Sequence, residues 1–191
     1  MTPSGRGQTV QVAPFYRLLL GRGFESLPAP IRQLHDVSGE TIARGRCHVR
    51  RGEHPLSRLA GRIFGLPPAG ENLPVKVRFL PQAGGERWYR RFGTHRLASY
   101  QVPAGRPGWM FESFGPGRFL IELAAGREGL TLSLRGVQFL GLPLPRALWP
   151  RVRAGERVED GRFVFDVEIA LPVAGLLIHY HGHLRPEGAA D

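Results

Sequence analysis

Cysteine and lysine are almost absent from the 191-residue sequence, with Cys47 and Lys76 as the single examples. One cysteine excludes an intramolecular disulfide and any metal site built on several thiolates. Cys47 alternates with small residues in a predicted strand, which indicates a buried structural thiol rather than a nucleophile. Without a closed set of cysteine and histidine ligands, we expect no tightly bound zinc, no other metal and no cofactor.

Long apolar runs are absent too. No window of about 18 consecutive apolar residues occurs, and the N-terminus lacks the apolar core of a signal peptide. We therefore expect no transmembrane segment and a cytoplasmic location. No GxGxxG motif follows a predicted strand, and neither Ser113 nor Ser133 lies in a nucleophile-elbow sequence. The sequence alone does not identify a reaction.

Acidic residues are few relative to basic ones: 16 Asp and Glu against 26 Lys and Arg give a net charge of +10. This excess favours acidic partners such as phosphates, anionic lipid surfaces or carboxylated ligands. A coding bias towards arginine explains the same excess without any partner. Arginine mixes with aromatic residues and His95 in residues 87–96, a composition that can stack bases and grip phosphate. No known nucleic-acid module fits the predicted strand order, so we expect no nucleic-acid partner.

The composition that remains is that of a globular protein rich in turns. Apolar residues make up 42% of the chain, and it contains 26 glycines and 17 prolines, which favours a β-rich fold. We expect one domain over residues 13–185. A disordered tail is predicted over residues 1–12, and a short C-terminal tail over residues 186–191.

Strands are predicted from period-two alternation. From residue 73 onwards, alternating segments recur about every 10 residues with Gly or Pro turns between them, which suits an antiparallel meander. The clearest example is the pair of strands in residues 161–184. One face of this pair is apolar and the other mostly polar, so one side of the sheet should be buried. The apolar face consists of Phe163, Phe165, Val167, Ile169, Ile178, Tyr180 and Leu184.

Helices are predicted near residues 14–20, 30–35 and 55–65. The last of these carries one apolar stripe at helical spacing. Core packing is one explanation of the stripe. Because Arg58 and Arg62 flank it, a lid over a pocket or a membrane-facing surface is the alternative. The stripe consists of Leu56, Leu59, Ala60, Ile63 and Phe64.

These elements predict an α+β fold: a strongly curved antiparallel sheet of about eight or nine strands, curled into a partial barrel, with two or three packed helices. Strand twist accumulates over so many strands and curls the sheet. A sheet of this size often leaves a cavity between itself and a helix. A helix-grip fold is a rival, but it ends in a long helix, whereas this chain ends in a strand.

A predicted strand over residues 40–51 has a basic face, on which Arg44, Arg46 and His48 lie together. If that face is concave, Arg44 and Arg46 form a fork for a carboxylate or phosphate. If it is convex, both arginines are simply solvated. Arg44, Arg46 and His48 are therefore candidate ligand-binding residues.

The last predicted strand carries a row of histidines, and His179 and His181 complete the candidate ligand-binding set. Neighbours in this row are about 6.8 Å apart, so two of them need a further ligand from another strand to hold a metal ion. A solvent-facing row and a site for a ligand or a proton are the alternatives. The row is His179, His181 and His183, and the candidate further ligands are His48, His95, Asp166 and Glu168.

Several stretches occur together in a recognisable combination: PFYRLLLG, IFGLPPAGENLPV, ERWYRRFG, LGLPLPRALWPRV and EDGRFVFDVEIALPVAGLL. This combination resembles the bacterial family known as domain of unknown function 4166, over roughly residues 14–185. The resemblance implies a domain found alone or joined to a dinucleotide-binding oxidoreductase domain similar to saccharopine dehydrogenases. An oxidoreductase is therefore a candidate partner. The shared stretches are structural rather than catalytic, and the histidine row is not among them.

Three functions fit these observations. The first is a non-catalytic domain that binds a small lipophilic or anionic ligand in a cavity between curved sheet and helix. The second is an enzyme, or the accessory domain of an oxidoreductase, that uses a histidine-lined site. The third is a protein-interaction module. A closed apolar cavity favours the first, convergent histidines with a carboxylate in a cleft favour the second, and a flat apolar patch without a cavity favours the third.

Overall fold

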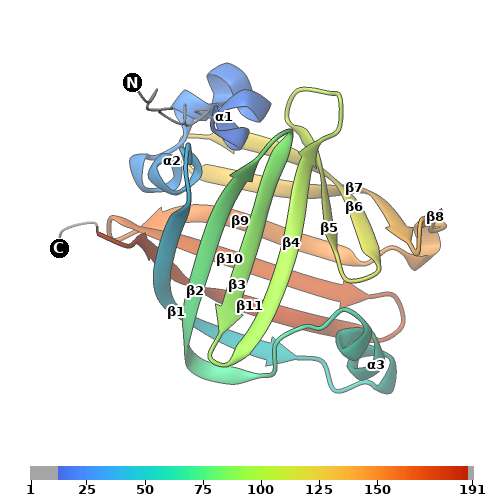
Figure 1. The fold of residues 1–191 in the computed structure, drawn as a ribbon. Helices are drawn as coiled ribbons and strands as arrows, with labels where there is room; N and C mark the ends of the chain where they lie inside the picture. The colour runs from blue at the N-terminus through green and yellow to red at the C-terminus, as the bar shows by residue number, and fades with distance from the viewer. Residues whose placement is uncertain (1–12, 189–191) are drawn as a thin grey trace, which may run out of the picture.

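The computed structural model describes residues 13–188, so the tail predicted over residues 1–12 lies outside the described range. A single antiparallel sheet winds around the molecule, with short helices at its two ends (Figure 1). The barrel strands are β1 (Thr41–Arg51), β2 (Gly70–Gln82), β3 (Gly85–Phe92), β4 (His95–Pro103), β5 (Trp109–Phe114), β6 (Gly117–Gly126), β7 (Gly129–Phe139), β9 (Arg151–Glu159), β10 (Arg162–Leu171) and β11 (Gly175–Pro186).

The sheet closes on itself. Its strand order is β6-β5-β4-β3-β2-β1-β11-β10-β9-β7, and β6 also pairs with β7. The prediction of an α+β fold with an antiparallel sheet is confirmed, but the partial barrel of eight or nine strands is wrong, because the barrel is closed and has ten strands. Closure follows because β7 pairs with both β6 and β9, so the two edges of the curled sheet meet. The short strand β8 (Leu142–Pro143) pairs with β7 outside the barrel.

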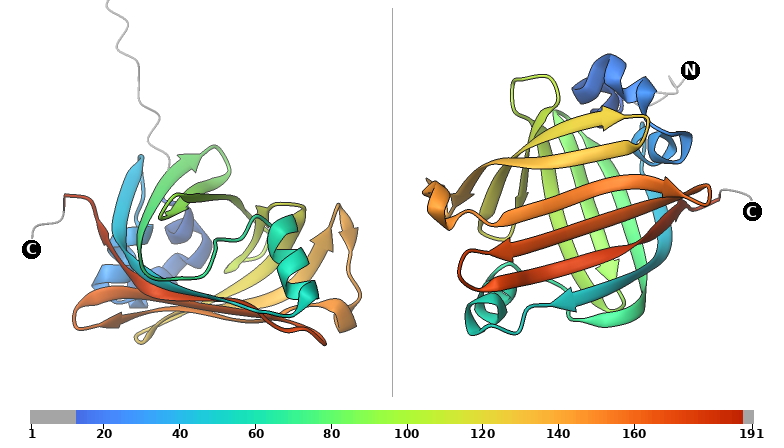
Figure 2. Two further views of the ribbon diagram at one scale, coloured as in Figure 1. Left: turned by 90° about the horizontal axis from the view of Figure 1, so that it is seen from below. Right: turned by 180° about the vertical axis from the view of Figure 1, so that it is seen from behind.

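Three α-helices accompany the barrel, as predicted. Helices α1 (Phe15–Leu20) and α2 (Ala29–His35), joined by the 3-10 helix η1 (Gly21–Ser26), cover one end. Helix α3 (Pro55–Ile63) lies at the opposite end (Figures 1 and 2). A second 3-10 helix, η2 (Arg146–Leu148), belongs to the connection from β8 to β9. The first end is filled by buried apolar side chains, which include Phe24, Leu27, Ile31 and Leu34.

The face assignments for the last two strands are confirmed. Phe163, Phe165, Ile178 and Leu184 are buried in the core, whereas the polar residues that alternate with them, Asp166, Glu168, His179 and His181, are more exposed. Val164 and Leu177 at alternate positions are buried as well. Asp160 precedes Gly161 in the turn before β10, and both have positive φ (48° and 73°). That conformation is the one an Asp-Gly hairpin turn requires, and it fixes the register of β9 against β10.

Strands β1 and β11 approach each other unusually closely. A Cβ atom on Gly45 would lie 1.7 Å from the carbonyl oxygen of His183, so only glycine fits there. Nearby, Cys47 is buried, and burial raises the pKa of its thiol to about 11. A thiol with a raised pKa is a poor nucleophile, in agreement with the structural role predicted for it.

Within residues 13–188, every helix is too short or too polar to cross a membrane.

Candidate ligand-binding cavity

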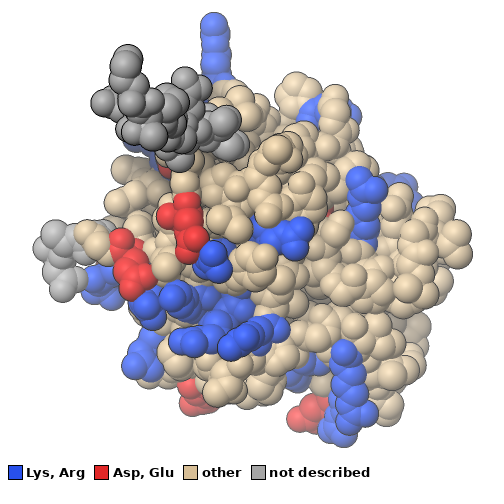
Figure 3. Space-filling model, viewed as in Figure 1, with Lys and Arg blue, Asp and Glu red and all other residues tan. Residues whose placement is uncertain are grey.

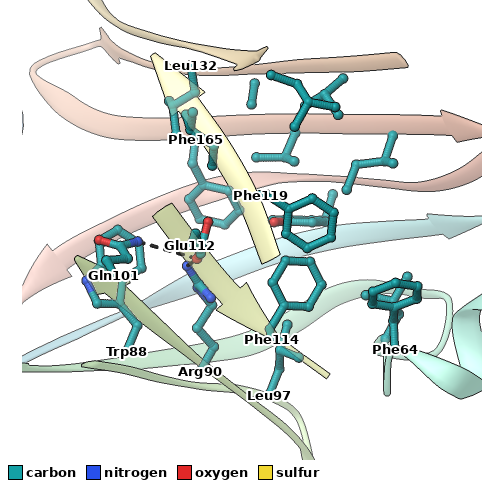
Figure 4. A pocket seen from close by; sticks show the side chains of 18 of the residues that line it. Phe64, Trp88, Arg90, Leu97, Gln101, Glu112, Phe114, Phe119, Leu132 and Phe165 are labelled. Atoms are coloured by element: carbon teal, nitrogen blue, oxygen red, sulfur yellow. Dashed lines mark hydrogen bonds and ion pairs between the residues drawn. The ribbon is translucent and has the colours of Figure 1, made fainter. Parts of the chain in front are cut away.

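The barrel encloses a cavity of about 270 Å³. This volume is close to the lower end of the range for small-molecule sites, about 300–1,000 Å³. Its walls are mostly aliphatic and aromatic side chains that alternate with outward-facing residues along each strand. Figure 4 shows part of this lining. The residues labelled there include Phe64, Leu97, Phe114, Phe119, Leu132 and Phe165.

One wall carries a connected group of polar side chains (Figure 4). Arg90 of β3 donates to Glu112 of β5 at 3.1 Å and to the hydroxyl of Ser99 at 2.8 Å. Gln101 donates to the same Glu112 oxygen at 3.4 Å and accepts a hydrogen bond of 3.1 Å from the Tyr16 hydroxyl. The Arg90–Glu112 pair is mostly buried, and its mutual neutralisation is what makes two charges tolerable in an apolar barrel.

A second polar pair lies under the helices at the closed end. His35 of α2 is 2.6 Å from Glu156 of β9, and its ring stacks on Tyr16 with centroids 4.0 Å apart. Burial lowers the pKa of His35, but the Glu156 carboxylate outweighs this, so its pKa is raised above the usual 6.5. The other ring nitrogen, Nδ1, is buried and has no hydrogen-bond partner among the described residues. Because His35 lines the cavity, that nitrogen is a candidate contact for a bound molecule.

Charge in the cavity is therefore balanced pair by pair. Arg90 faces Glu112, and His35 faces Glu156. A permanently charged ligand would meet no free counter-charge in either pair. A neutral polar group that both donates and accepts hydrogen bonds would fit better.

The cavity reaches the surface where the barrel seam is incomplete. Residues 129–132 of β7 pair with residues 154–157 of β9, but beyond them the two strands diverge (Figure 2, right). The connection that contains η2 runs beside this opening, and Leu144, Leu148 and Pro150 from it line the cavity. Leu148 is also 57% exposed, so this side of the cavity opens to solvent.

Helix α3 borders the same end, in an orientation that differs from the core-packing interpretation. Leu56, Leu59 and Ile63 are 52%, 53% and 47% exposed, whereas Ser57 and Gly61 are buried. Of the five stripe residues, Ala60 and Phe64 pack against the core. Phe64 lines the cavity. It also contacts a group of aromatic rings formed by Phe114, Phe119 and Phe139.

An arginine explains why α3 turns its small residues inwards. The Arg51 guanidinium donates to the carbonyl oxygens of Leu177, Leu66 and Pro67, at 3.2, 3.2 and 2.9 Å. It passes so close to Gly61 that a Cβ atom there would lie 1.5 Å from Nη2. The inner face of α3 is therefore occupied by a fixed cation and has no room for a leucine stripe.

The five ligand-binding residues predicted from the sequence lie elsewhere, on the outer face of β1 and β11. None of Arg44, Arg46, His48, His179 and His181 lines the cavity. They do lie near one another: the His181 ring is 5.4 Å from that of His48 and 5.3 Å from that of His179. Arg44 pairs with Glu187 at 2.9 Å, and Arg46 donates to the carbonyl oxygen of Asn72. Figure 3 shows the basic character of this side of the molecule, around β1 to β3.

The histidine row also fails to converge with a carboxylate in a cleft. His179 is 2.9 Å from Asp166 of β10, but Asp166 lies on the same outer face. No group of three or more His, Cys, Asp or Glu side chains within residues 13–188 is arranged to hold a metal ion.

One of the polar cavity residues, Arg90, comes from a stretch whose pattern already contained the signal. In residues 87–92, Trp88, Arg90 and Phe92 share one face, and that face points into the barrel. Arg87 and Arg91 are on the outer face. The aromatic residues that could have stacked on a nucleic-acid base are thus mostly inside. Gln101 and Glu112 carried no comparable signal, because their role depends on contacts between strands.

One family model matches the chain. The family model described as Domain of unknown function (DUF4166) matches residues 27–184, a span that begins just before α2 and ends within β11. No curated protein matched the chain. Because the match covers most of the 191 residues and every barrel strand, the chain belongs to the DUF4166 family.

Proposed function

We propose that this domain binds a small lipophilic molecule inside the barrel, without catalysing a reaction. The observation that supports the proposal most directly is the cavity itself. It is apolar over most of its wall, carries one connected polar group, and opens to solvent beside η2. A ligand that covers the apolar wall of the cavity removes that surface from water, which stabilises the complex.

The polar residues suggest which end of the ligand lies deepest. Tyr16 and His35 are at the end closed by α1 and α2, and Phe64 and Leu148 are at the open end. A ligand with a single polar group would place that group near Tyr16 and His35 and its apolar part towards the opening. The unpartnered Nδ1 of His35 and the shared oxygen of Glu112 suit a hydroxyl, an amide or a protonated acid.

The alternatives receive less support. A histidine-based enzyme would place its chemistry at His179 and His181, on the outer face and away from the cavity. An anion held by Arg44 and Arg46 would likewise bind outside the barrel. A cytoplasmic location and an oxidoreductase partner remain separate proposals, for which cell fractionation and co-purification from the source organism are the tests.

Binding of a neutral lipophilic probe, 1-aminoanthracene, tests the cavity. Ala154 of β9 lines the cavity, whereas Ala98 of β4 is exposed on the outer face. The change Ala154→Phe fills part of the space, and we expect it to weaken probe binding by more than roughly tenfold. The same change at Ala98 should leave binding unchanged. Equal probe affinity in both variants and in the unmodified protein would exclude the cavity as the site, and native mass spectrometry of freshly purified protein can then search for a co-purified ligand directly.

A further inference from the structure

We propose that the open end of the barrel docks on the surface of an anionic lipid bilayer. The docking surface is an apolar rim around the cavity opening. Of the nine large apolar residues that are exposed within residues 13–188, seven lie at this end, which is not the scattered distribution expected for an ordinary surface. The apolar rim consists of Leu56, Leu59 and Ile63 on α3, Val173 in the β10–β11 turn, and Leu140, Leu142 and Leu148 around β8 and η2.

The three parts of the rim lie along one edge of the molecule. In Figure 1 and in both views of Figure 2, α3, the turn between β10 and β11, and the β8 region are at the same end of the barrel. The cavity opens at this end, because Leu148 of η2 lines it and is 57% exposed. Phe64, directly after α3, lines it as well. A partner that docked on the rim would therefore also cover the cavity opening.

The rim cannot be turned inwards to become core. Arg51 occupies the inner face of α3 through three hydrogen bonds to backbone carbonyls. Ser57, one turn before Gly61, donates to the Ala174 carbonyl and holds α3 against the β10–β11 turn. The leucines of α3 are thus held facing outwards and need an external partner to leave water.

Val173 adds an independent sign of function. It is 97% exposed and has φ +67°, a left-handed conformation that is unfavourable for a β-branched residue. Asparagine or glycine would satisfy the turn with less strain. An exposed valine at such a position gives no packing in return, which suggests that its side chain is retained for contact with something outside the chain.

Charge identifies the partner. Residues 55–64, 140–151 and 172–176 contain four arginines, Arg58, Arg62, Arg146 and Arg151, and no acidic residue; the nearest acid before α3 is Glu53. All four arginines are exposed, and none makes an ion pair within the described part of the chain. Apolar side chains interspersed with arginines fit the headgroup region of an anionic bilayer, where the former insert and the latter meet phosphates.

A second copy of the chain fits the rim less well. A symmetric dimer through this surface would bring the arginines of one copy against those of the other, and like charges facing each other are unfavourable. A bilayer presents the opposite charge and an apolar interior. It is also the reservoir of lipophilic molecules, so docking would bring the cavity opening to its ligand. This last role depends on the proposed function, but the docking itself does not.

Co-flotation of the full-length protein with vesicles tests the proposal. We expect binding to mixed phosphatidylcholine–phosphatidylglycerol vesicles, weaker binding to phosphatidylcholine alone, and a decrease with added salt. Leu56→Gln with Leu59→Gln should reduce binding more than roughly tenfold, whereas Leu18→Gln, an exposed leucine on α1, should not. Arg58→Gln with Arg62→Gln should also weaken binding, and the matched pair Arg44→Gln with Arg46→Gln should not.

Two further measurements make the result decisive. Val173→Asn should lower vesicle binding while its melting temperature stays equal or rises, an outcome that a structural role for Val173 would not produce. Binding of 1-aminoanthracene should persist in all rim variants, so failure of docking and failure of cavity binding are seen separately. Absence of binding to anionic vesicles, or equal binding by rim and control variants, would overturn the proposal. A dimer that Leu56→Gln with Leu59→Gln dissociates, without vesicle binding, would assign the rim to a second copy.

Discussion

Helices α2 and α3 lie at opposite ends of one barrel and carry similar residues in opposite surroundings. In α2, Ile31 is fully buried; in α3, Ile63 is 47% exposed. Each helix is short, has proline in its first turn, and carries apolar residues at helical spacing. The difference therefore does not come from the helices alone. It comes from the part of the barrel against which each helix packs.

At the α2 end, the barrel offers a wide apolar opening that Ile31 and Leu34 fill together with Phe24 and Leu27. At the α3 end, the place of such side chains is taken by Arg51 and by the close approach of Gly61. The comparison teaches that helical spacing reveals an apolar stripe but not the surface that covers it. One end of this barrel is closed by its own chain, and the other is left apolar and open.

The largest expected effect comes from the barrel wall between the two ends. Phe165 is buried mid-strand and packs against Tyr180 and Phe163, so Phe165→Ala should lower the free energy of unfolding by about 3–5 kcal/mol. Phe64, at the open end, is only partly buried, so Phe64→Ala should lower the free energy of unfolding by less. Urea unfolding of both variants measures the difference. An unchanged melting temperature for Phe165→Ala would mean that its side chain does not face the core.

A matched pair of isoleucines tests the comparison of the ends directly. Ile31→Ala in α2 should lower the free energy of unfolding by about 2–5 kcal/mol, because it leaves a cavity in a closed core. Ile63→Ala in α3 should change it by no more than about 0.5 kcal/mol, as is usual for exposed positions. Chemical denaturation of the two variants under one condition is sufficient. Comparable losses at the two sites would show that α3 is packed in solution as tightly as α2.

The sequence predicted the strands well where alternation is strong and failed where it is weak. The faces of β10 and β11 followed from regular alternation of aromatic or branched residues with polar ones. Strand β9 was not recognised, because its sequence RVRAGERVE has only Val152, Ala154 and Val158 as small apolar members among charges. Barrel closure was missed for a related reason. It depends on β7 pairing with β9, a contact across an intervening connection that local pattern does not encode.

The candidate site was harder to predict than the fold. Alternation places Arg90 on the same face as Trp88 and Phe92, but an arginine on an apolar face is normally expected to turn outwards, since an unpaired buried charge is costly. The partner that allows Arg90 to stay inside is Glu112, on a strand 22 residues further along. The basic face of β1 and the histidine row of β11 are more conspicuous in the sequence, but the barrel curvature places both outside.

A smaller effect is expected at the closed end, in its contribution to the pH dependence of stability. Burial raises the pKa of Glu86 above the usual 4.5, and Glu156 raises that of His35 above the usual 6.5 despite burial. The folded state therefore holds protons more tightly than the unfolded state, and stability should fall as the pH rises through these two ranges. Glu86→Gln should reduce the decrease in stability in the more acidic range, where Glu86 titrates.

Denaturation curves recorded between about pH 4.5 and about pH 8 check this expectation. The exposed Glu71, changed to Gln, is the matched control and should leave the slope as it is. If the free energy of unfolding changes with pH equally in Glu86→Gln and in the unmodified protein, other groups cause the pH dependence.

The smallest effect is expected on the outer wall, at the two arginines that the sequence had suggested as a fork for an anion. Arg44 and its partner Glu187 are about half exposed, so water and salt screen their attraction, and the double change Arg44→Gln with Arg46→Gln should lower stability by less than about 1 kcal/mol. The same change at Arg90 should be much more damaging, because it leaves Glu112 buried without its counter-charge. If the ligand occupies the cavity, 1-aminoanthracene should bind the double variant as well as it binds the unmodified protein. Binding of inorganic phosphate by the unmodified protein that is lost in the double variant would instead support an anion site on the outer face, and it would move the functional surface from the end of the barrel to its side.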